Sequence, residues 1–381
     1  MRKGWEYKKL GEVCTLISDG SHNPPKGIDN SLYRMISSQN VFDDNLQITE
    51  DNVRYITETD HLCENKRTKL QKDVVLLTIV GTIGRSCVLK GNEGCLTLQR
   101  SVAALHPSDQ IMPRYLMHCL IGNRHTLNQE AHGIAQKGIY LKQLSSLSIP
   151  LPPLSTQLSI VSELDKINEL IRLKKEQHKD FDNLAQSIFY EMFGDPVENE
   201  RGWEVKKISN IAKYHNGVAH EQDIDKDGDF VLINAKFISS EGQIKKYTSI
   251  QRFPLFKNDI VMVLSDLPNG KSLAKCFLID EDNKYTLNQR ICCFRGFDGS
   301  SIYLKNIINR NPYLLSFDNG KGQTNLRKGD VEKIPIPLPP LPLQQLFAQR
   351  IEQIEHQKAE VQKSIMDLET LLASRMQYWF E

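Results

Sequence analysis

The sequence predicts an α+β protein in which one unit occurs twice: a mixed α/β lobe, a proline-rich joint and a long helix. Three observations support this prediction. The run Ile149-Pro-Leu-Pro-Pro-Leu154 recurs as Ile336-Pro-Leu-Pro-Pro-Leu341, at an offset of 187 residues, and such a repeat indicates duplicated structure. A long helical pattern follows each run. Short strand-like runs bounded by Gly, Asn and Pro precede each one.

The repeat divides the 381 residues into four segments. We expect a first lobe over 1–148, a joint and helix over 149–195, a second lobe over 200–335, and a second joint and helix over 336–381. No apolar run reaches the roughly 18 residues that a membrane span needs. The N-terminal residues also lack the apolar core of a signal peptide. We therefore expect no membrane association and a cytoplasmic location.

Each joint leads into a helix whose seam residues alternate at spacings of four and three, which is typical of a coiled coil. Polar seam positions could fix the register of an antiparallel pair at a cost in stability, or could be solvated ends. The seams are Ile160, Leu164, Ile167, Ile171, Lys174, His178, Phe181, Ala185, Ile188 and Met192, and, 187 residues later, Phe347, Ile351, Ile354, Lys358, Val361, Ile365, Leu368, Leu372, Arg375 and Trp379.

The lobes repeat more faintly but in the same order, so they should share a fold while their exposed residues differ. The matching segments are Gly4-Trp-Glu-Tyr-Lys-Lys9 with Gly202-Trp-Glu-Val-Lys-Lys207, Tyr33-Arg-Met-Ile36 with Phe230-Val-Leu-Ile233, Asp73-Val-Val-Leu76 with Asp259-Ile-Val-Met262, Gly84-Arg85-Ser86 with Gly270-Lys271-Ser272, and Gln99-Arg100 with Gln289-Arg290 at an offset of 190.

The composition does not indicate a metal site, and the net charge of each lobe is too small to indicate a strong nucleic-acid binder. Residues 1–150 carry 18 basic and 15 acidic side chains, and residues 200–335 carry 21 and 17. An excess this small fits scatter as well as it fits a nucleic-acid partner. The eight cysteines lack C-x-x-C spacing and the ten histidines lack paired spacing, so we expect buried reduced thiols and structural histidines.

Two fragments imitate catalytic motifs. Asn23-Pro-Pro-Lys26 resembles the Asn-Pro-Pro-aromatic loop of amino-methyltransferases, but lysine cannot stack on a flipped base as an aromatic ring does. Asn269-Gly-Lys-Ser272 resembles the end of a phosphate-binding loop, but Ser265 stands where the first glycine belongs. We interpret both as turns and expect no catalytic residues. Several turns instead carry small, basic and amide side chains, which suit contacts to phosphates and base edges.

The whole arrangement resembles the DNA-specificity subunit of Type I restriction-modification systems. The resemblance covers the entire chain and depends on the Gly-Trp-Glu starts at 4–6 and 202–204, the Gly-Thr-Ile-Gly turn at 81–84, the two joints and the heptad helices. After the joint, the family's usual Glu-Gln is here Thr156-Gln157 and Gln344-Gln345.

The resemblance implies two target-recognition domains that each read half of a bipartite, asymmetric double-stranded DNA target, with the helices packed antiparallel as a spacer. A helix of about 38 residues is roughly 57 Å long, more than the roughly 35 Å of one DNA turn. The resemblance also implies partners: two methyltransferase subunits that methylate adenine, and restriction subunits that cleave. Those partners would use S-adenosylmethionine, ATP and Mg, and this chain would hold no cofactor and do no chemistry.

Matched repeat positions nominate DNA-binding residues, each of which could instead be an exposed loop residue or part of a structural salt bridge. A non-catalytic coiled-coil scaffold with two protein-interaction domains is the alternative, and an enzyme of the methyltransferase class would need a cofactor site that we do not find. The nominated residues are His22, Arg34, Gln39, Arg85 and Arg100 in the first lobe, and Asn234, Lys236, Lys271, Arg290 and Lys321 in the second.

Overall fold

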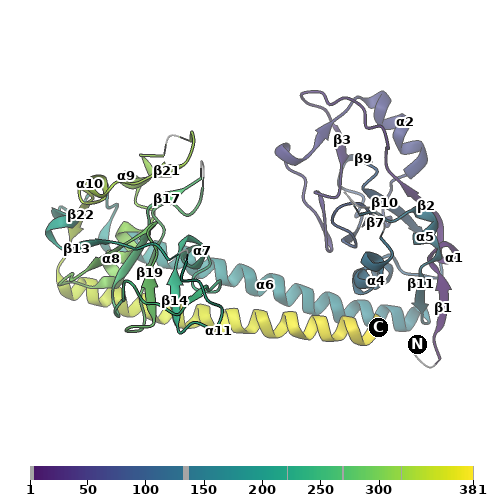
Figure 1. Ribbon diagram of the computed structural model, residues 1–381. Helices are drawn as coiled ribbons and strands as arrows, with labels where there is room; N and C mark the ends of the chain where they lie inside the picture. Colours follow the sequence, from purple (N-terminus) through teal and green to yellow (C-terminus); the bar gives the residue numbers. More distant parts are fainter. Residues whose placement is uncertain (1–3, 132–136, 221, 268–269, 319, 381) are drawn as a thin grey trace. The chain divides into compact units, whose positions relative to one another are not determined.

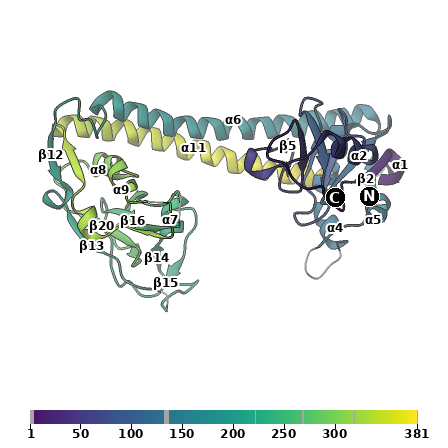
Figure 2. The same ribbon diagram turned by 90° about the horizontal axis from the view of Figure 1, so that it is seen from above.

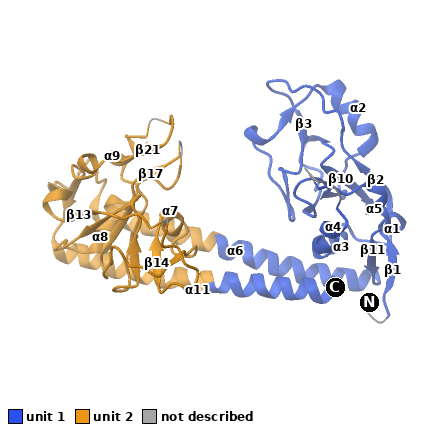
Figure 3. Cartoon of the chain, in the orientation of Figure 1, with its two compact units in different colours: residues 1–175, 363–381 blue, residues 176–362 orange. Residues whose placement is uncertain are grey.

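A computed structural model of the chain contains two compact units (Figures 1 and 3). Each unit holds one lobe and part of both long helices, α6 (Leu154–Phe193) and α11 (Leu341–Phe380). No helix in the described part of the chain is long and apolar enough to cross a membrane. The units comprise residues 1–175 with 363–381, and residues 176–362. The structure describes residues 4–131, 137–220, 222–267, 270–318 and 320–380.

The first lobe contains an antiparallel sheet of order β2-β10-β7-β8 and a second sheet of order β6-β3-β9, in which β3 and β9 are parallel. Its elements are β1 (Glu6–Lys9), α1 (Leu10–Val13), β2 (Cys14–Asp19), β3 (Tyr33–Ile36), β4 (Val41–Phe42), β5 (Asn45–Leu46), a 3-10 turn (Glu50–Asn52), β6 (Arg54–Tyr55), α2 (Glu58–Thr68), β7 (Val75–Thr78), β8 (Ser86–Val88), β9 (Cys95–Leu98), β10 (Val102–Pro107), α3 (Pro113–Gly122), α4 (Arg124–Gln129), α5 (Leu141–Ser146) and β11 (Ser148–Leu151).

The second lobe repeats this topology, with an antiparallel sheet of order β13-β20-β16-β18 and a sheet of order β15-β14-β19 whose β14 and β19 are parallel. Its elements are β12 (Glu204–Lys207), a 3-10 turn (Ile208–Asn210), β13 (Lys213–Asn216), β14 (Phe230–Ile233), α7 (Ala235–Ser239), β15 (Tyr247–Thr248), β16 (Ile260–Val263), β17 (Ser265–Asp266), β18 (Cys276–Leu278), β19 (Tyr285–Leu287), β20 (Ile291–Arg295), α8 (Ser301–Ile308), α9 (Pro312–Leu315), β21 (Thr324–Asn325), α10 (Lys328–Val331) and β22 (Pro335–Leu338).

The central strands are apolar on both faces because each separates two cores. Side chains alternate along a strand, so in β7 Val75 and Leu77 join the core that contains the start of α6, while Leu76 joins the core under the second sheet. In β20 the neighbouring Cys292 and Cys293 lie in opposite cores for the same reason. The vicinal cysteines are therefore packing residues.

The expectation of buried thiols is wrong for two of the eight cysteines. Cys63 and Cys95 are exposed, whereas the other six are buried, and all eight are free. Cys63 lies on α2, and Cys95 begins β9, a strand at the edge of its sheet. Neither position receives the double cover that a central strand has.

The two long helices pack antiparallel within each unit, which confirms the predicted fold class (Figures 1 and 2). In the first unit Arg375 of α11 pairs with Glu163 of α6, and Glu369 pairs with Lys175 (2.6 Å). In the second, Lys358 Nζ lies 2.6 Å from an Asp182 carboxylate oxygen. Every predicted seam residue is buried or half-buried, so the polar seam positions are not fully solvated.

The proline joints are short strands that both lobes hold in the same way. β11 pairs with β1, and β22 pairs with β12. The buried Tyr115 donates its hydroxyl to the carbonyl of Pro150 (2.9 Å), and the buried Tyr303 donates to that of Pro337 (2.7 Å). These contacts match at a near-constant offset, so the repeat extends to the hydrogen bonds that fix where each helix begins.

The glutamines after the joints correct one sequence pairing. Gln157 Nε2 donates to the carbonyl of Pro152 (2.9 Å), and Gln344 Nε2 donates to that of Pro339 (2.8 Å). Gln157 therefore corresponds to Gln344. The pairing of Thr156-Gln157 with Gln344-Gln345 is displaced by one residue, because adjacent glutamines in the second copy obscure which one is buried.

Candidate nucleic-acid interface

Three loops of the first lobe meet at one edge, where the parallel strands β3 and β9 end. Gln99, directly after β9, donates its backbone N–H to the last carbonyl of β3 (2.8 Å). Arg100 donates its backbone N–H to the carbonyl of Ser21, in the loop after β2 (2.9 Å). Ser38, in the loop after β3, donates its backbone N–H to the Ser101 hydroxyl (3.0 Å). Loops at the carboxyl ends of parallel strands commonly form binding sites.

This edge gathers three of the nominated residues. His22, Gln39 and Arg100 are exposed and lie on these three loops. His22 Nε2 lies 2.7 Å from a carboxylate oxygen of Asp19, which also pairs with Arg67. The buried Asp19 therefore orients the His22 ring while leaving most of the ring exposed.

A fourth loop, after β7, joins the same edge and carries Arg85. Ile79 donates its backbone N–H to the carbonyl of Ser101 (2.9 Å). The half-buried Arg85 donates its backbone N–H to the Thr78 hydroxyl (2.9 Å), and its guanidinium lies 4.7 Å from the centre of the Phe42 ring. A cation over an aromatic face is held by about 0.5–1 kcal/mol at such a site, so the ring steers the Arg85 side chain.

Arg34 lies apart from this group. It is near the start of β3, and its guanidinium donates to the carbonyl of Glu93, just before β9 begins. A Cβ on Gly94 would lie 2.8 Å from this guanidinium. The structure thus places Arg34 at the amino ends of the parallel pair, away from the edge where the other nominated residues gather.

The second lobe forms the corresponding edge. Asn288, directly after β19, donates its backbone N–H to the last carbonyl of β14 (3.1 Å) and forms a bridge with Val218. Leu264, after β16, donates its backbone N–H to the carbonyl of Arg290 (3.0 Å). The same loops therefore meet in both copies, although their side chains differ.

A glycine in each copy permits the close approach of strands at this edge. A Cβ on Gly20 would lie 2.1 Å from the carbonyl oxygen of Leu98, and one on Gly217 would lie 2.0 Å from that of Asn288. Real Cβ atoms do not approach backbone oxygen so closely. Both positions therefore require glycine for reasons of space.

The nominated residues of the second lobe have different surroundings. Asn234 Oδ1 accepts the N–H of the third residue of α7 (3.0 Å), so Asn234 is a helix cap. Lys236, Lys271, Arg290 and Lys321 are all exposed. The backbone carbonyl of Lys271 also accepts a hydrogen bond from the Arg310 guanidinium. None of these positions is tested as a DNA contact, and the nominations stay predictions.

The structure corrects three repeat pairings within the lobes. Asp73 and Asn258 each donate a backbone N–H to the end of the neighbouring strand, at Leu89 and Ile279, so Asp73 corresponds to Asn258 and not to Asp259.

The second correction concerns the turn at Arg85. Thr78 donates its backbone N–H to the carbonyl of Arg85, and Val263 donates to that of Lys275, so Arg85 corresponds to Lys275 and not to Lys271.

The third correction shifts the Gln-Arg pairing by one residue. Gln99 and Asn288 make equivalent bridges, which sets the local offset at 189. Arg100 therefore corresponds to Gln289, and Arg290 corresponds to Ser101. The pairing at 190 was wrong because the turns have equal length while the Gln-Arg dipeptide stands one position later in the second copy.

Sequence reasoning missed two arginines that contact the turns carrying nominated residues. Arg124 donates to the carbonyl of Gly84, and Arg310 donates to that of Lys271. Arg124 stands 39 residues after Arg85, and Arg310 stands 39 residues after Lys271. This equal spacing does not reflect the repeat: Asn123 and Asn311 each donate to the carbonyl four residues earlier and are counterparts, so Arg124 follows the shared position and Arg310 precedes it.

The fragments that resemble catalytic motifs lie in irregular segments of the chain. The carbonyl of Pro25 accepts a hydrogen bond from the Arg54 guanidinium (3.0 Å). Ser272 donates its backbone N–H to the Asp266 carboxylate (2.6 Å), and no helix follows it as a phosphate-binding loop requires; position 269 lies outside the described residues. Among described side chains, no group of His, Cys, Asp and Glu is arranged to hold a metal ion.

Two buried histidines make equivalent contacts below the edge. His61 Nδ1 lies 2.8 Å from the Thr97 hydroxyl, and His220 Nε2 lies 3.0 Å from the Thr286 hydroxyl. Burial lowers the pKa of His61, and the nearby Glu58 opposes that shift. Both rings brace the parallel strand that leads to the edge, which is a structural role.

A duplicated α+β lobe with matching loop edges, carried on an antiparallel helix pair, defines a two-site recognition protein. The family model described as the Type I restriction modification DNA specificity domain matches residues 2–180 and 200–369. The chain belongs to this family and holds two copies of its domain. It is a specificity subunit of a Type I restriction-modification system.

Known relatives span either part or most of the chain. The EcoBI specificity subunit of Escherichia coli is 28% identical over 34% of this chain, and the match spans only 28% of that subunit. The putative MjaX specificity subunit of Methanocaldococcus jannaschii is 22% identical over 92% of this chain and 87% of its own.

Two solved structures share the fold. The S subunit from M. genitalium aligns with a TM-score of 0.56 at 12% identity, covering 99% of this chain and 96% of its own. A chain from a study of Type I system assembly and conformational transition aligns at 0.58 and 15% identity, covering 100% and 98%.

Proposed function

We propose that each lobe reads one half of a bipartite, asymmetric DNA sequence, and that this chain directs adenine methylation and cleavage by partner subunits without catalysing either step. One observation carries the proposal: the two lobes share the loop edge but place different polar side chains on it. His22, Gln39 and Arg100 gather on the first edge, and Asn234 and Arg290 flank the second. Two similar loop edges that carry different side chains would suit two different DNA half-site sequences.

The edge has suitable chemistry for reading bases. Arginine bonds guanine with two hydrogen bonds, and asparagine or glutamine does so with adenine. Main-chain contacts fix the loops, so little conformational entropy remains to be lost on binding. The modest basic excess of each lobe fits a complex in which partner subunits neutralise much of the phosphate charge.

The partners follow from the same assignment. Two methyltransferase subunits would dock on the duplicated lobes and helices, one for each copy. Restriction subunits would complete the complex in the cytoplasm. The partners would bring S-adenosylmethionine, ATP and Mg.

The decisive experiment maps adenine methylation in cells that express the methyltransferase partner with or without this chain. The expected result is one asymmetric bipartite motif that disappears when the chain is absent. Exchange of residues 200–335 with those of another family member should change one half of the motif and leave the other intact. An unchanged methylome beside an active partner subunit would refute the proposal, and would favour a scaffold that holds two protein-interaction domains.

A further inference from the structure

In the first lobe, the Arg124 guanidinium donates hydrogen bonds to the main chain directly before Arg85. Its Nε and Nη2 donate to the carbonyl of Gly84 at 3.1 and 3.0 Å, and Nη2 also donates to Asp43 Oδ1 at 2.5 Å. Gly84 has a φ of +87°, and a Cβ there would lie 2.8 Å from Arg124 Cγ. The arginine side chain therefore packs on the glycine and also fixes the peptide plane between Gly84 and Arg85.

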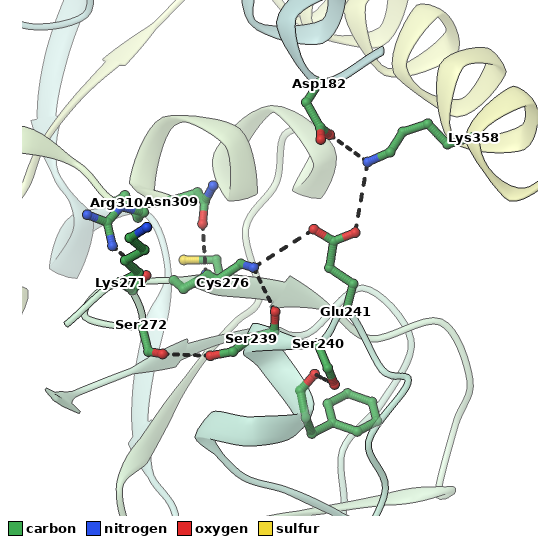
Figure 4. Close-up of polar contacts among 12 residues, drawn as sticks. Asp182, Ser239, Ser240, Glu241, Lys271, Ser272, Cys276, Asn309, Arg310 and Lys358 are labelled. Atoms are coloured by element: carbon green, nitrogen blue, oxygen red, sulfur yellow. Dashed lines mark hydrogen bonds and ion pairs between the residues drawn. The ribbon is translucent and has the colours of Figure 1, made fainter. Parts of the chain in front are cut away.

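In the second lobe, Arg310 contacts the main chain directly after Lys271 (Figure 4). Its Nη1 donates to the carbonyl of Lys271 at 2.5 Å, and its backbone N–H donates to the carbonyl of Ala274 at 2.8 Å. Figure 4 also shows the Ser272 hydroxyl against that of Ser239, 2.6 Å away. Arg310 thus fixes the peptide plane between Lys271 and Ser272.

The two contacts are of the same kind, but they do not lie at equivalent positions of the repeat. Gly84 donates its backbone N–H to the carbonyl of Thr78, and Ala274 donates to that of Val263, so Ala274 is the counterpart of Gly84. Each arginine closely follows a helix of its lobe, α3 or α8. Arg124 binds the carbonyl of the residue before Arg85, and Arg310 binds the carbonyl of Lys271 itself. The first is oriented by an aspartate, and the second by a left-handed backbone at Arg310, whose φ is 51°. The two lobes thus place a guanidinium on the peptide beside a nominated residue from positions that are not equivalent in the repeat.

We propose that Arg124 and Arg310 are positioning residues for DNA specificity, each setting the direction of the side chain on the turn that it grips. The inference rests on the proposed function and assigns one arginine to each half-site. A guanidinium that holds a peptide plane acts through the turn and makes no direct base contact. Its loss would therefore blur the reading of one half-site while leaving the other unchanged.

The test uses the full chain in complex with its methyltransferase partner and the motif found by methylome mapping. Arg124→Lys and Arg310→Lys keep the positive charge but lack the planar guanidinium. Each variant is compared on the cognate duplex and on duplexes with one base pair changed in either half. We expect discrimination in one half-site to fall about tenfold, the lower part of what a bidentate base contact supplies, and discrimination in the other half-site to hold.

The two variants serve as controls for each other, and Arg172→Lys on α6, whose arginine pairs with Glu169 (2.6 Å), controls for arginine loss outside the lobes. The salt dependence of binding separates positioning from a phosphate contact. A positioning arginine leaves the slope of log K against log salt unchanged even in Arg124→Gln, whereas loss of a phosphate contact lowers that slope by about one. Equal weakening on all duplexes with a lower slope would overturn the inference.

If Arg124→Lys lowers the melting temperature of the complex, Asp43→Asn provides a milder change. It removes the charge that orients Arg124 from a partly exposed position and should relax the same half-site to a smaller degree. Undiminished discrimination in both stable variants would overturn the inference. A wild-type complex that methylates without any bipartite motif would instead refute the proposed function, which keeps the two failures distinct.

Discussion

Replacing Lys358 by isoleucine should leave the second unit as stable as before or make it more stable. Lys358 occupies a seam position with its side chain only 7% exposed, and its repeat counterpart is the buried Ile171. Burial opposes the charge on Lys358, but the hydrogen bond that Lys358 donates to Asp182, together with the nearby Glu355 and Glu241, outweighs burial and raises the Lys358 pKa. A buried ion pair often contributes less than well-packed apolar side chains of similar volume.

Removing the other partner should have the opposite effect. At 2.6 Å and an effective dielectric constant of about 20, the gross attraction is about 6 kcal/mol, but most of it offsets desolvation. Asp182 is 57% exposed, so solvent screens the pair on one side. Asp182→Ala should therefore cost about 2 kcal/mol, between the at most 1 kcal/mol of a surface pair and the 3–5 kcal/mol of a fully buried one.

Urea unfolding followed by far-ultraviolet circular dichroism measures both variants. We expect Lys358→Ile within about 1 kcal/mol of the wild type or above it, and Asp182→Ala clearly below. Because the folded pKa of Lys358 is raised, its contribution is complete below the unfolded value of about 10.5 and is lost as pH rises through the folded value. The reasoning would be refuted if Lys358→Ile had a lower free energy of unfolding than Asp182→Ala.

Three further outcomes are expected. Phe193→Ala and Phe380→Ala each remove a buried ring from the core of its own unit and should each cost about 3–5 kcal/mol in unfolding free energy, which limited proteolysis should locate in that unit alone. Gly20→Ala should unfold or displace the first lobe's loop edge, because its Cβ would lie 2.1 Å from a carbonyl oxygen, and hydrogen exchange at β9 should rise while β19 stays protected. Asp165→Asn should make the free energy of unfolding depend less on pH in acid, as measured by urea unfolding at several pH values. Burial raises the pKa of Asp165, but hydrogen bonds from His118 and Arg114 lower it by more. The stabilisation from Asp165 is therefore complete above the unfolded pKa of about 3.8 and is lost as pH falls through the folded pKa.

The long helices and joints were predictable because their signals are local and periodic. A seam that alternates between four and three residues identifies a helix face without knowledge of its partner, and both seams are buried or half-buried as expected. The polar position at Lys358 was recognised, but its partner Asp182 lies 176 residues away and off the seam. Pairing between two elements follows from register, which spacing along one element does not reveal.

The loop edges were only partly predictable. The repeat paired the turn at Arg85 with Lys271, whereas the main-chain hydrogen bonds pair Arg85 with Lys275, because the loop after β16 is longer than the loop after β7. The edge itself depends on the parallel pairing of β3 with β9, strands of four residues that lie about 60 positions apart in the sequence. Arg34 shows the limit of that reading: it matches the strand repeat, yet it lies at the opposite end of the strand from the loops that meet.

The contacts shared by the two copies are mainly those between a side chain and the main chain. Tyr115 and Tyr303 bind joint carbonyls, and so do Gln157 and Gln344. Ion pairs between lobe and helix differ between the copies: His118 of the first lobe contacts Asp165 on α6, and Glu241 of the second lobe lies 3.9 Å from Lys358 on α11. A carbonyl is present whatever residue carries it, so contacts to carbonyls survive substitution of the neighbouring side chains. A lobe whose backbone is held by such contacts can keep its geometry while the side chains on its loops change. Two lobes that read different DNA sequences would require this.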